Sequence, residues 1–207
     1  MRLKEYILNE GTSSEVHQIL KENCKPYLQS SKMWYYRTVS SAKEVKLSNK
    51  DGILNLKPRM DRKPSDTPQY LHGLIDGWFK KKFGWKVRSE GVFTYPKNEI
   101  SGPQFVFPIG TFKFVYSPKV LDLYRTICQF RPKVPGALAV NLMHLTNTDI
   151  MDKLFELFID GYGDSYTNKN INGSGLDSEV VFGCKEYYLV DMSKLLRFKE
   201  PKDILKI

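Results

Sequence analysis

Arg37 lies among aromatic and β-branched residues, and the composition of residues 33–39 predicts a β-strand. A buried guanidinium without an anionic partner is costly, so an arginine in such a strand must reach solvent or meet an anion. Its planar fork of donors suits bidentate binding of a phosphate or a carboxylate. A structural ion pair at a strand edge is the alternative, and the sequence leaves both interpretations open.

Asp177 and Glu179 lie where a segment rich in Gly, Asn and Ser, residues 162–177, meets the apolar run 179–182. Alternate residues of an extended segment share one face, so these carboxylates would point the same way. A carboxylate at the start of a strand can hydrogen-bond a ribose hydroxyl and stabilise positive charge at an anomeric carbon. The alternative is a pair of loop carboxylates in water.

Ser89 and Thr94 are hydroxyl residues on either side of Gly91, in a stretch from 85 to 95 that predicts a strand. A glycine within a strand permits the close approach of a ligand or of another backbone. Hydroxyls are common in strands, so these two residues are candidates only together with the arginine and the carboxylates.

A dense charged segment, with Arg59 and Arg62 in it, leads into a predicted helix at residues 68–83. Basic side chains beside a helix N-terminus favour an anion, so phosphate contact is one interpretation for the arginines. For Asp66 and Thr67 we favour capping of the helix. His72, one turn into the helix, either faces the same site or packs in the core.

A basic cluster follows this helix, and Trp85 and Tyr95 interleave with it. Its members are Lys80, Lys81, Lys82, Lys86 and Arg88. Cations and aromatic rings together are typical of surfaces that bind single-stranded nucleic acid. Cations at a helix C-terminus are also ordinary partners of the helix dipole.

The 207 residues carry a formal net charge of +9, which favours anionic partners. The sequence lacks the glycine patterns of Rossmann and P-loop nucleotide sites, the metalloprotease and hydrolase motifs, and any histidine spacing suited to a metal. No secretory signal or membrane-spanning run is recognisable, and three scattered cysteines favour a reducing compartment. We therefore expect a cytoplasmic protein without a bound metal.

The pattern of apolar residues predicts a single α+β domain, residues 1–207, with a mostly antiparallel twisted β core flanked by helices. We expect a long polar loop at about 40–66 and a charged tail from about 193. Helices are predicted at 14–28, 68–83, 120–130 and 148–160, and strands at 33–39, 85–95, 104–109, 111–116, 179–182 and 186–190.

The order of an arginine strand, a Ser/Thr strand and a late Glu-Val-Val-Phe strand resembles the layout of the mono-ADP-ribosyltransferases. The resemblance implies an ADP-ribosyltransferase-like fold. It also implies NAD as substrate, bound without a Rossmann motif. It implies that Arg37 holds the NAD phosphates, that Ser89 or Thr94 supports the nicotinamide ribose, and that Glu179 stabilises the oxocarbenium-like transition state. Asp177 would then stand at the position that contacts the acceptor.

The stretches at 59–73 and 184–190 also resemble motifs in proteins of tailed bacteriophages. The resulting expectation is a glycosyltransferase that moves ADP-ribose from NAD to a host macromolecule, in the host cytoplasm. The alternative is a non-catalytic basic phage protein that binds nucleic acid or an acidic host protein. A nuclease or phosphodiesterase using Asp61, Asp76 and Asp122 is a third possibility, but these carboxylates lack a compact metal spacing.

Overall fold

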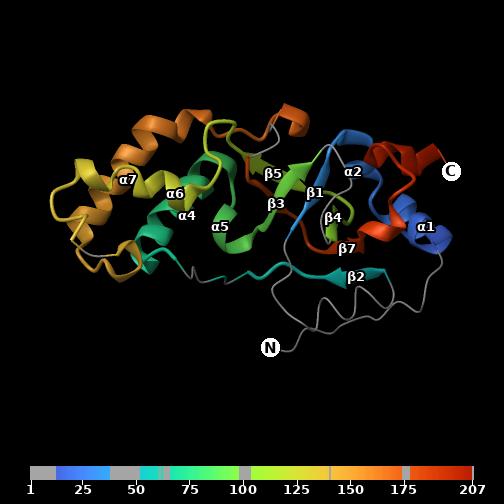
Figure 1. Cartoon of the computed structure of the whole chain (residues 1–207), viewed down its shortest axis with the longest axis horizontal. Helices are drawn as coiled ribbons and strands as arrows, with labels where there is room; N and C mark the ends of the chain where they lie inside the picture. The colour runs from blue at the N-terminus through green and yellow to red at the C-terminus, as the bar shows by residue number, and fades with distance from the viewer. Residues whose placement is uncertain are drawn as a thin grey trace.

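A computed structural model describes residues 13–37, 52–60, 62, 66–97, 104–139, 141–173 and 178–206. These residues form an α+β fold around one sheet of seven strands (Figure 1). The strands are β1 (Trp34–Tyr36), β2 (Ile53–Leu56), β3 (Val92–Lys97), β4 (Gln104–Pro108), β5 (Lys113–Tyr116), β6 (Val180–Gly183) and β7 (Tyr187–Asp191). Every pairing is antiparallel and the order is β2-β7-β4-β1-β3-β6-β5, so the predicted antiparallel core is confirmed.

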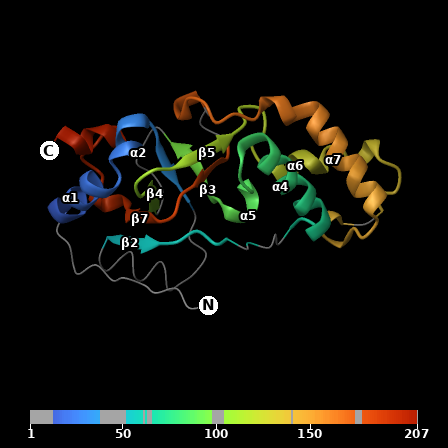
Figure 2. The same ribbon diagram turned by 180° about the vertical axis from the view of Figure 1, so that it is seen from behind.

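The helices gather at the two ends of the sheet (Figures 1 and 2). The α-helices are α1 (Ser13–Asn23), α2 (Lys25–Ser30), α4 (Gln69–Phe83), α5 (Val87–Glu90), α6 (Leu123–Cys128) and α7 (Thr148–Tyr162). The 3₁₀ helices are η1 (Arg131–Lys133), η2 (Leu142–His144), η3 (Gly163–Ser165), η4 (Ile171–Gly173), η5 (Met192–Lys194) and η6 (Pro201–Lys206). No helix within these ranges is long and apolar enough to cross a bilayer.

Strand β6 separates two hydrophobic clusters. Val180 and Phe182 pack with α1, α2 and the strands β1, β4 and β7, whereas Val181 packs on the opposite face with α4, α6 and α7. This division follows from the alternation of side chains along a strand. The face that holds Val181 is the one on which the candidate site lies.

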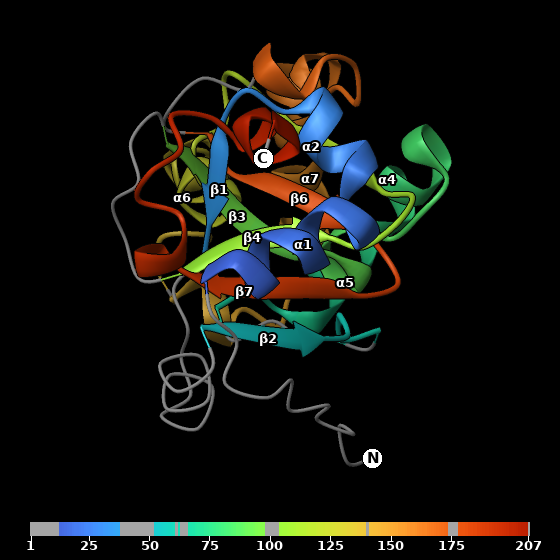
Figure 3. The same cartoon turned by 90° about the vertical axis from the view of Figure 1, so that its right-hand side faces the viewer.

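Two predicted elements are divided or displaced. The helix expected at 14–28 is interrupted at Cys24, and α2 restarts with Pro26 in its first turn, where a proline is tolerated. The connection expected at 40–66 contains β2, which pairs with β7 along the edge of the sheet (Figure 3). A loop without a strand was therefore the wrong prediction for residues 53–56.

The segment from 85 to 95 also differs from its prediction. It is a strand only from Val92, because residues 87–90 form the short helix α5. Asp76 on α4 accepts hydrogen bonds from the backbone amides of Arg88 and Ser89, at 2.8 and 3.1 Å. This carboxylate caps α5 from a distant part of the chain, so Arg88 and Ser89 belong to a helical turn instead of the predicted strand.

Helix α4 matches its prediction more closely. It ends at Gly84, whose φ of 82° supplies the left-handed C-cap. Its N-cap is Pro68 and has no side-chain cap, while the Thr67 hydroxyl donates to Asp66. The predicted capping of this helix by Asp66 and Thr67 is therefore wrong.

Candidate functional site

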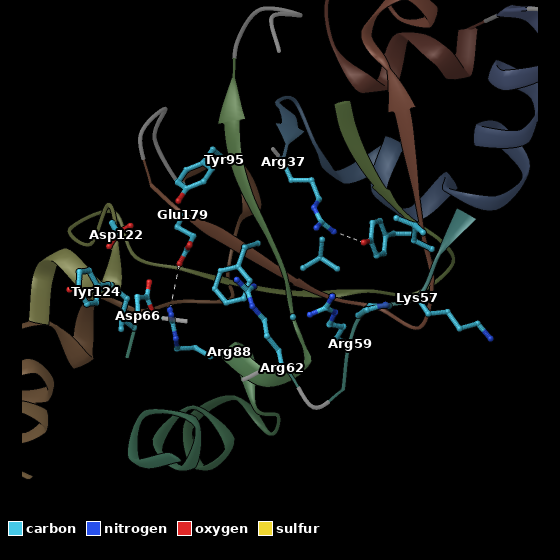
Figure 4. Close-up of a pocket in the computed structure, with 17 residues that line it drawn as sticks. Arg37, Lys57, Arg59, Arg62, Asp66, Arg88, Tyr95, Asp122, Tyr124 and Glu179 are labelled. Atoms are coloured by element: carbon cyan, nitrogen blue, oxygen red, sulfur yellow. Dashed lines mark hydrogen bonds and ion pairs between the residues drawn. The ribbon is translucent and has the colours of Figure 1, made fainter. Parts of the chain in front are cut away.

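A cleft of about 520 Å³ opens over β3, β1 and β7, on the face of the sheet that α4, α6 and α7 leave uncovered (Figure 4). Arg37 and Glu179, which are 142 positions apart in the sequence, both line it. It is also lined by Leu56, Lys57, Pro58, Arg59, Arg62, Asp66, Arg88, Gly91, Val92, Phe93, Tyr95, Asp122, Leu123, Tyr124 and Tyr187. The structure thus gathers a guanidinium and a carboxylate that the sequence had singled out.

The register of β3 and β6 positions Glu179. Thr94 pairs with Val180, so Glu179, directly before β6, lies opposite Tyr95. Phe93 lies opposite Val181 in the same register and on the same face. The rings of Phe93 and Tyr95 and the carboxylate of Glu179 therefore line the cleft together, and Figure 4 shows Tyr95 close to Glu179.

Arg37 follows β1 directly, and its backbone amide donates to the carbonyl of Gln104 on β4. Its guanidinium donates to the Tyr187 hydroxyl through Nη1, at 2.5 Å, and lies 5.9 Å from the centre of that ring. Among the described residues, no carboxylate lies within salt-bridge distance of this half-buried guanidinium. This arrangement favours the anion-binding interpretation over a structural ion pair.

The unpredicted strand β2 brings the charged segment to the cleft. Leu56 pairs with Tyr187, so Lys57 and Arg59 leave the sheet beside Arg37. The segment then runs to α5, where the Arg62 amide donates to the Ser89 carbonyl at 3.4 Å. Both predicted anion-binding arginines of this segment therefore line the same cleft as Arg37.

The carboxyl of Glu179 has a pKa raised from 4.5 to about 7. Burial is the main cause, because its side chain is only 18% exposed and burial disfavours the charged form. The Arg88 guanidinium, 3.9 Å away, acts to lower this pKa, as does Arg62, while Asp122 and Asp66 raise it further. A glutamate that titrates near neutrality inside a cleft is typical of a functional site.

The Phe93 ring carries two cations. The guanidinium carbon of Arg62 lies 4.2 Å from the ring centre and that of Arg88 lies 5.3 Å from it. Although the Arg62 residue is exposed overall, burial of its guanidinium and repulsion from Arg88 and Arg37 lower its pKa. Arg62 thus shares the cleft with two other guanidiniums at close range, and a bound anion would offset this repulsion.

Tyr95 and Tyr187 are residues of the cleft that sequence reasoning missed. Burial, followed by the charge of Glu179, raises the pKa of the Tyr95 phenol to about 12. The sequence associates Tyr95 with the basic cluster and Tyr187 with the stretch 184–190, and only the alternation along β3 and the register of β7 with β2 could have indicated their place in the cleft. Asp122, whose carboxylate caps α6 through the Arg125 amide at 2.8 Å, was singled out only as a scattered carboxylate.

Ser89 and His72 do not line the cleft. His72 Nε2 lies 3.0 Å from the Ser89 hydroxyl and 3.3 Å from Asp76, and the hydroxyl donates to the same carboxylate. Hydrogen bonds from His72, Ser89 and the Arg88 amide outweigh the effect of burial and lower the pKa of Asp76. This buried network holds α4 and α5 together, so direct contact of Ser89 or His72 with a cofactor is not what the geometry supports.

Thr94 is fully buried, and its hydroxyl donates to the Val180 carbonyl at 2.7 Å. It braces the backbone directly after Glu179 without reaching the cleft. The Thr94 hydroxyl therefore supports the pairing of β3 with β6. Asp177, the other predicted catalytic carboxylate, lies outside the described residues.

The basic cluster at the end of α4 is divided. Lys80, Lys81, Lys82 and Lys86 are all exposed, and the Lys82 ammonium also donates to the Gly163 carbonyl at 2.6 Å. The Arg88 side chain, 12% exposed, turns into the cleft. The two interleaved rings are absent from this surface as well, because Trp85 is buried and Tyr95 lines the cleft.

Within the described ranges, no three His, Cys, Asp or Glu side chains are grouped so that they could hold a metal ion. Comparison of the chain with protein-family models, curated proteins and solved structures found no match.

Proposed function

We propose that this chain is an ADP-ribosyltransferase that cleaves NAD in the cleft between Arg37 and Glu179. The observation that carries the proposal is their convergence on one cavity of about 520 Å³, with a glutamate that titrates near pH 7. Pockets of roughly 300–1,000 Å³ are usual for small ligands and cofactors. The resemblance of the sequence to the mono-ADP-ribosyltransferases supports the proposal, because it implies matching roles for the two residues.

The charge of the cleft is divided in a way that suits NAD. Figure 4 shows Glu179, Asp122 and Asp66, with Arg88 beside them, on one side of Arg62, and Arg37 and Arg59 on the other. Lys57 lies on the side of Arg37 and pairs with Glu186 at 3.2 Å. The guanidinium end suits the diphosphate, because arginine binds phosphate oxygens in a bidentate manner. The carboxylate end suits the cationic nicotinamide ribose.

Glu179 in its ionised form would hydrogen-bond the ribose 2′-hydroxyl and stabilise positive charge as the bond between C1′ and the nicotinamide nitrogen breaks. Nicotinamide leaves with the bonding electron pair and is neutral. The acceptor nucleophile then forms a bond to C1′ and loses its proton. The acceptor is proposed only as a macromolecule, and Arg37 acts throughout by holding the diphosphate.

The test is incubation of the purified protein with NAD carrying a label in its adenylate, with release of nicotinamide and transfer of the label both measured. Removal of a charge-stabilising group costs about 10²–10³ in rate, so we expect Glu179→Gln to lose at least a hundredfold in nicotinamide release. Glu156→Gln, an exposed position on α7, is the matched control and should behave like the wild type. Full NAD cleavage by Glu179→Gln would refute the proposal.

The same preparation separates this proposal from the non-catalytic alternative. A ligand at 100 times its Kd adds about 2.7 kcal/mol to the free energy of unfolding, so NAD should raise the Tm of the wild type. A protein that only binds nucleic acid through Lys80, Lys81 and Lys86 would show no such shift. It would instead give a salt-sensitive gel shift that Glu179→Gln leaves unchanged.

A further inference from the structure

Arg88 occupies an unusual position for a cleft arginine, because most of its side chain is buried. Its side chain is 12% exposed, and Nη1 lies 3.9 Å from the Glu179 carboxylate. Its Nε is buried and has no hydrogen-bond partner within the described part of the chain. A guanidinium so placed is poorly exposed to a ligand but directly beside the carboxylate.

The backbone that carries Arg88 is held by hydrogen bonds to α4. Asp76 accepts from the amides of Arg88 and Ser89, and it also accepts from the Ser89 hydroxyl. Asp76 is itself buried on α4, with His72 beside it. Gly91, at the end of α5, permits this close packing, because a Cβ there would collide with Val181 and with the Val87 carbonyl.

We infer that Arg88 is a positioning residue for Glu179: anchored by Asp76, its guanidinium holds the glutamate side chain toward the cleft and favours its ionised form over the uncharged one. The inference depends on the proposed function for its catalytic meaning. The ion pair itself is independent of NAD. Its anchor is made of backbone hydrogen bonds, so replacement of the Arg88 side chain leaves the anchor in place.

Other groups facing Glu179 come from every element packed around it. Arg62 and Asp66 come from the connection before α4, Asp122 from the start of α6, and Tyr95 and Tyr166 from β3 and the segment after η3. Arg62 is the second cation near Glu179, but it lies at the exposed mouth of the cleft. Arg88 is the nearer cation and the one that burial protects from solvent screening.

The direction of the effect follows from simple electrostatics. An opposite charge within about 4–6 Å lowers a carboxyl pKa by roughly 1–3 units, so loss of Arg88 should raise that of Glu179 by at least one unit. From about 7, such a rise leaves about a tenth of the carboxyl ionised at pH 7 in place of half. Nicotinamide release at pH 7 should fall roughly fivefold for this reason and recover by pH 9.

The experiment compares the wild type, Arg88→Met and Arg125→Met, labelled with ¹³C at the glutamate carboxyls, by NMR titration without NAD. The Glu179 resonance is identified by its absence in Glu179→Gln. Arg125 is the matched control because it is exposed on α6 and does not line the cleft. If Arg88→Met does not fold, Arg88→Gln serves for the same comparison.

We expect the Glu179 titration midpoint to rise by at least one unit in Arg88→Met and to stay unchanged in Arg125→Met. The pH profile of nicotinamide release should shift by the same amount. An unchanged midpoint in Arg88→Met, or an equal loss of rate at pH 7 and pH 9, would overturn the inference. Absence of NAD cleavage by the wild type would instead refute the proposed function, while the NMR titration would still decide the ion pair.

Discussion

Glu179 should make the protein less stable at alkaline pH, in a way that Glu179→Gln removes. Its folded-state pKa of about 7 lies above the unfolded value of 4.5, so the folded chain binds more protons between these values. The contribution of this proton to stability is fully present below pH 4.5 and is lost as the pH rises through 7. A glutamine at this position does not titrate.

The size of the effect follows from the two pKa values. Linkage gives a loss of roughly 2–3 kcal/mol in the free energy of unfolding through this group between pH 5 and pH 8.5. On going from pH 5 to pH 8.5, the free energy of unfolding of Glu179→Gln should therefore gain roughly 2–3 kcal/mol relative to that of the wild type. Changes in other titrating groups largely cancel in this comparison.

The assay is urea unfolding of the wild type, Glu179→Gln and Glu156→Gln at the two pH values. Glu156 is exposed on α7, so its substitution should shift stability equally at both. A relative gain below about 1 kcal/mol for Glu179→Gln would refute burial of this carboxyl in its uncharged form.

Substitutions of Gly91, Asp76 and Thr94 test the elements around the site. Gly91→Ala should lower the free energy of unfolding in urea by about 1–3 kcal/mol, because its Cβ would collide with Val181 and the Val87 carbonyl. Gly73→Ala, in open space on α4, should raise the same free energy by about 0.4–1 kcal/mol, and equal effects of the two substitutions would contradict this packing. Asp76→Ala should lower the free energy of unfolding by at least about 3 kcal/mol at pH 7, because the backbone amides of α5 lose their acceptor. A loss under about 1 kcal/mol would show that the network does not stabilise the fold. Thr94→Val should lower the free energy of unfolding by about 1 kcal/mol and Thr94→Ser by much less, since only serine keeps a hydroxyl that can donate to the Val180 carbonyl. Equal losses would mean that this hydrogen bond does not contribute to stability.

The long amphipathic helices could be predicted from the sequence because their signals are local. In α4, apolar residues recur at helical spacing and Gly84 ends the helix, and α7 has the same kind of periodicity. The aromatic and β-branched runs of β4, β6 and β7 likewise identified strands near their observed bounds. These features depend on residues close together in the chain.

The elements that were missed depend on distant partners. The four residues of β2 are too few to show a period, and they form a strand because β7 offers them an edge. The helical turn α5 forms because Asp76, ten or more positions earlier, accepts its backbone amides. Ser89 could not be placed correctly without knowledge of this contact.

For the site, the sequence could identify Arg37 and Glu179 by residue type and context, and it could identify Arg59 and Arg62 by charge. It could not show that Arg88 belongs with Glu179 instead of with the lysines at the end of α4, because only the fold turns this side chain into the cleft. Tyr95 and Tyr187 acquire their positions from strand register. Their place in the cleft could therefore not be predicted without the strand pairing.

In the proposed function, Arg37 and Glu179 act on one bound molecule of NAD. The most direct measurement is isothermal titration of NAD into Glu179→Gln, which should bind without turnover, and into the same protein with Arg37→Met added. We predict one NAD per chain for the first and at least about tenfold weaker binding for the second, since a hydrogen bond to a charged group contributes about 1.5–3 kcal/mol. No binding by Glu179→Gln, or equal affinity of both proteins, would contradict the claim.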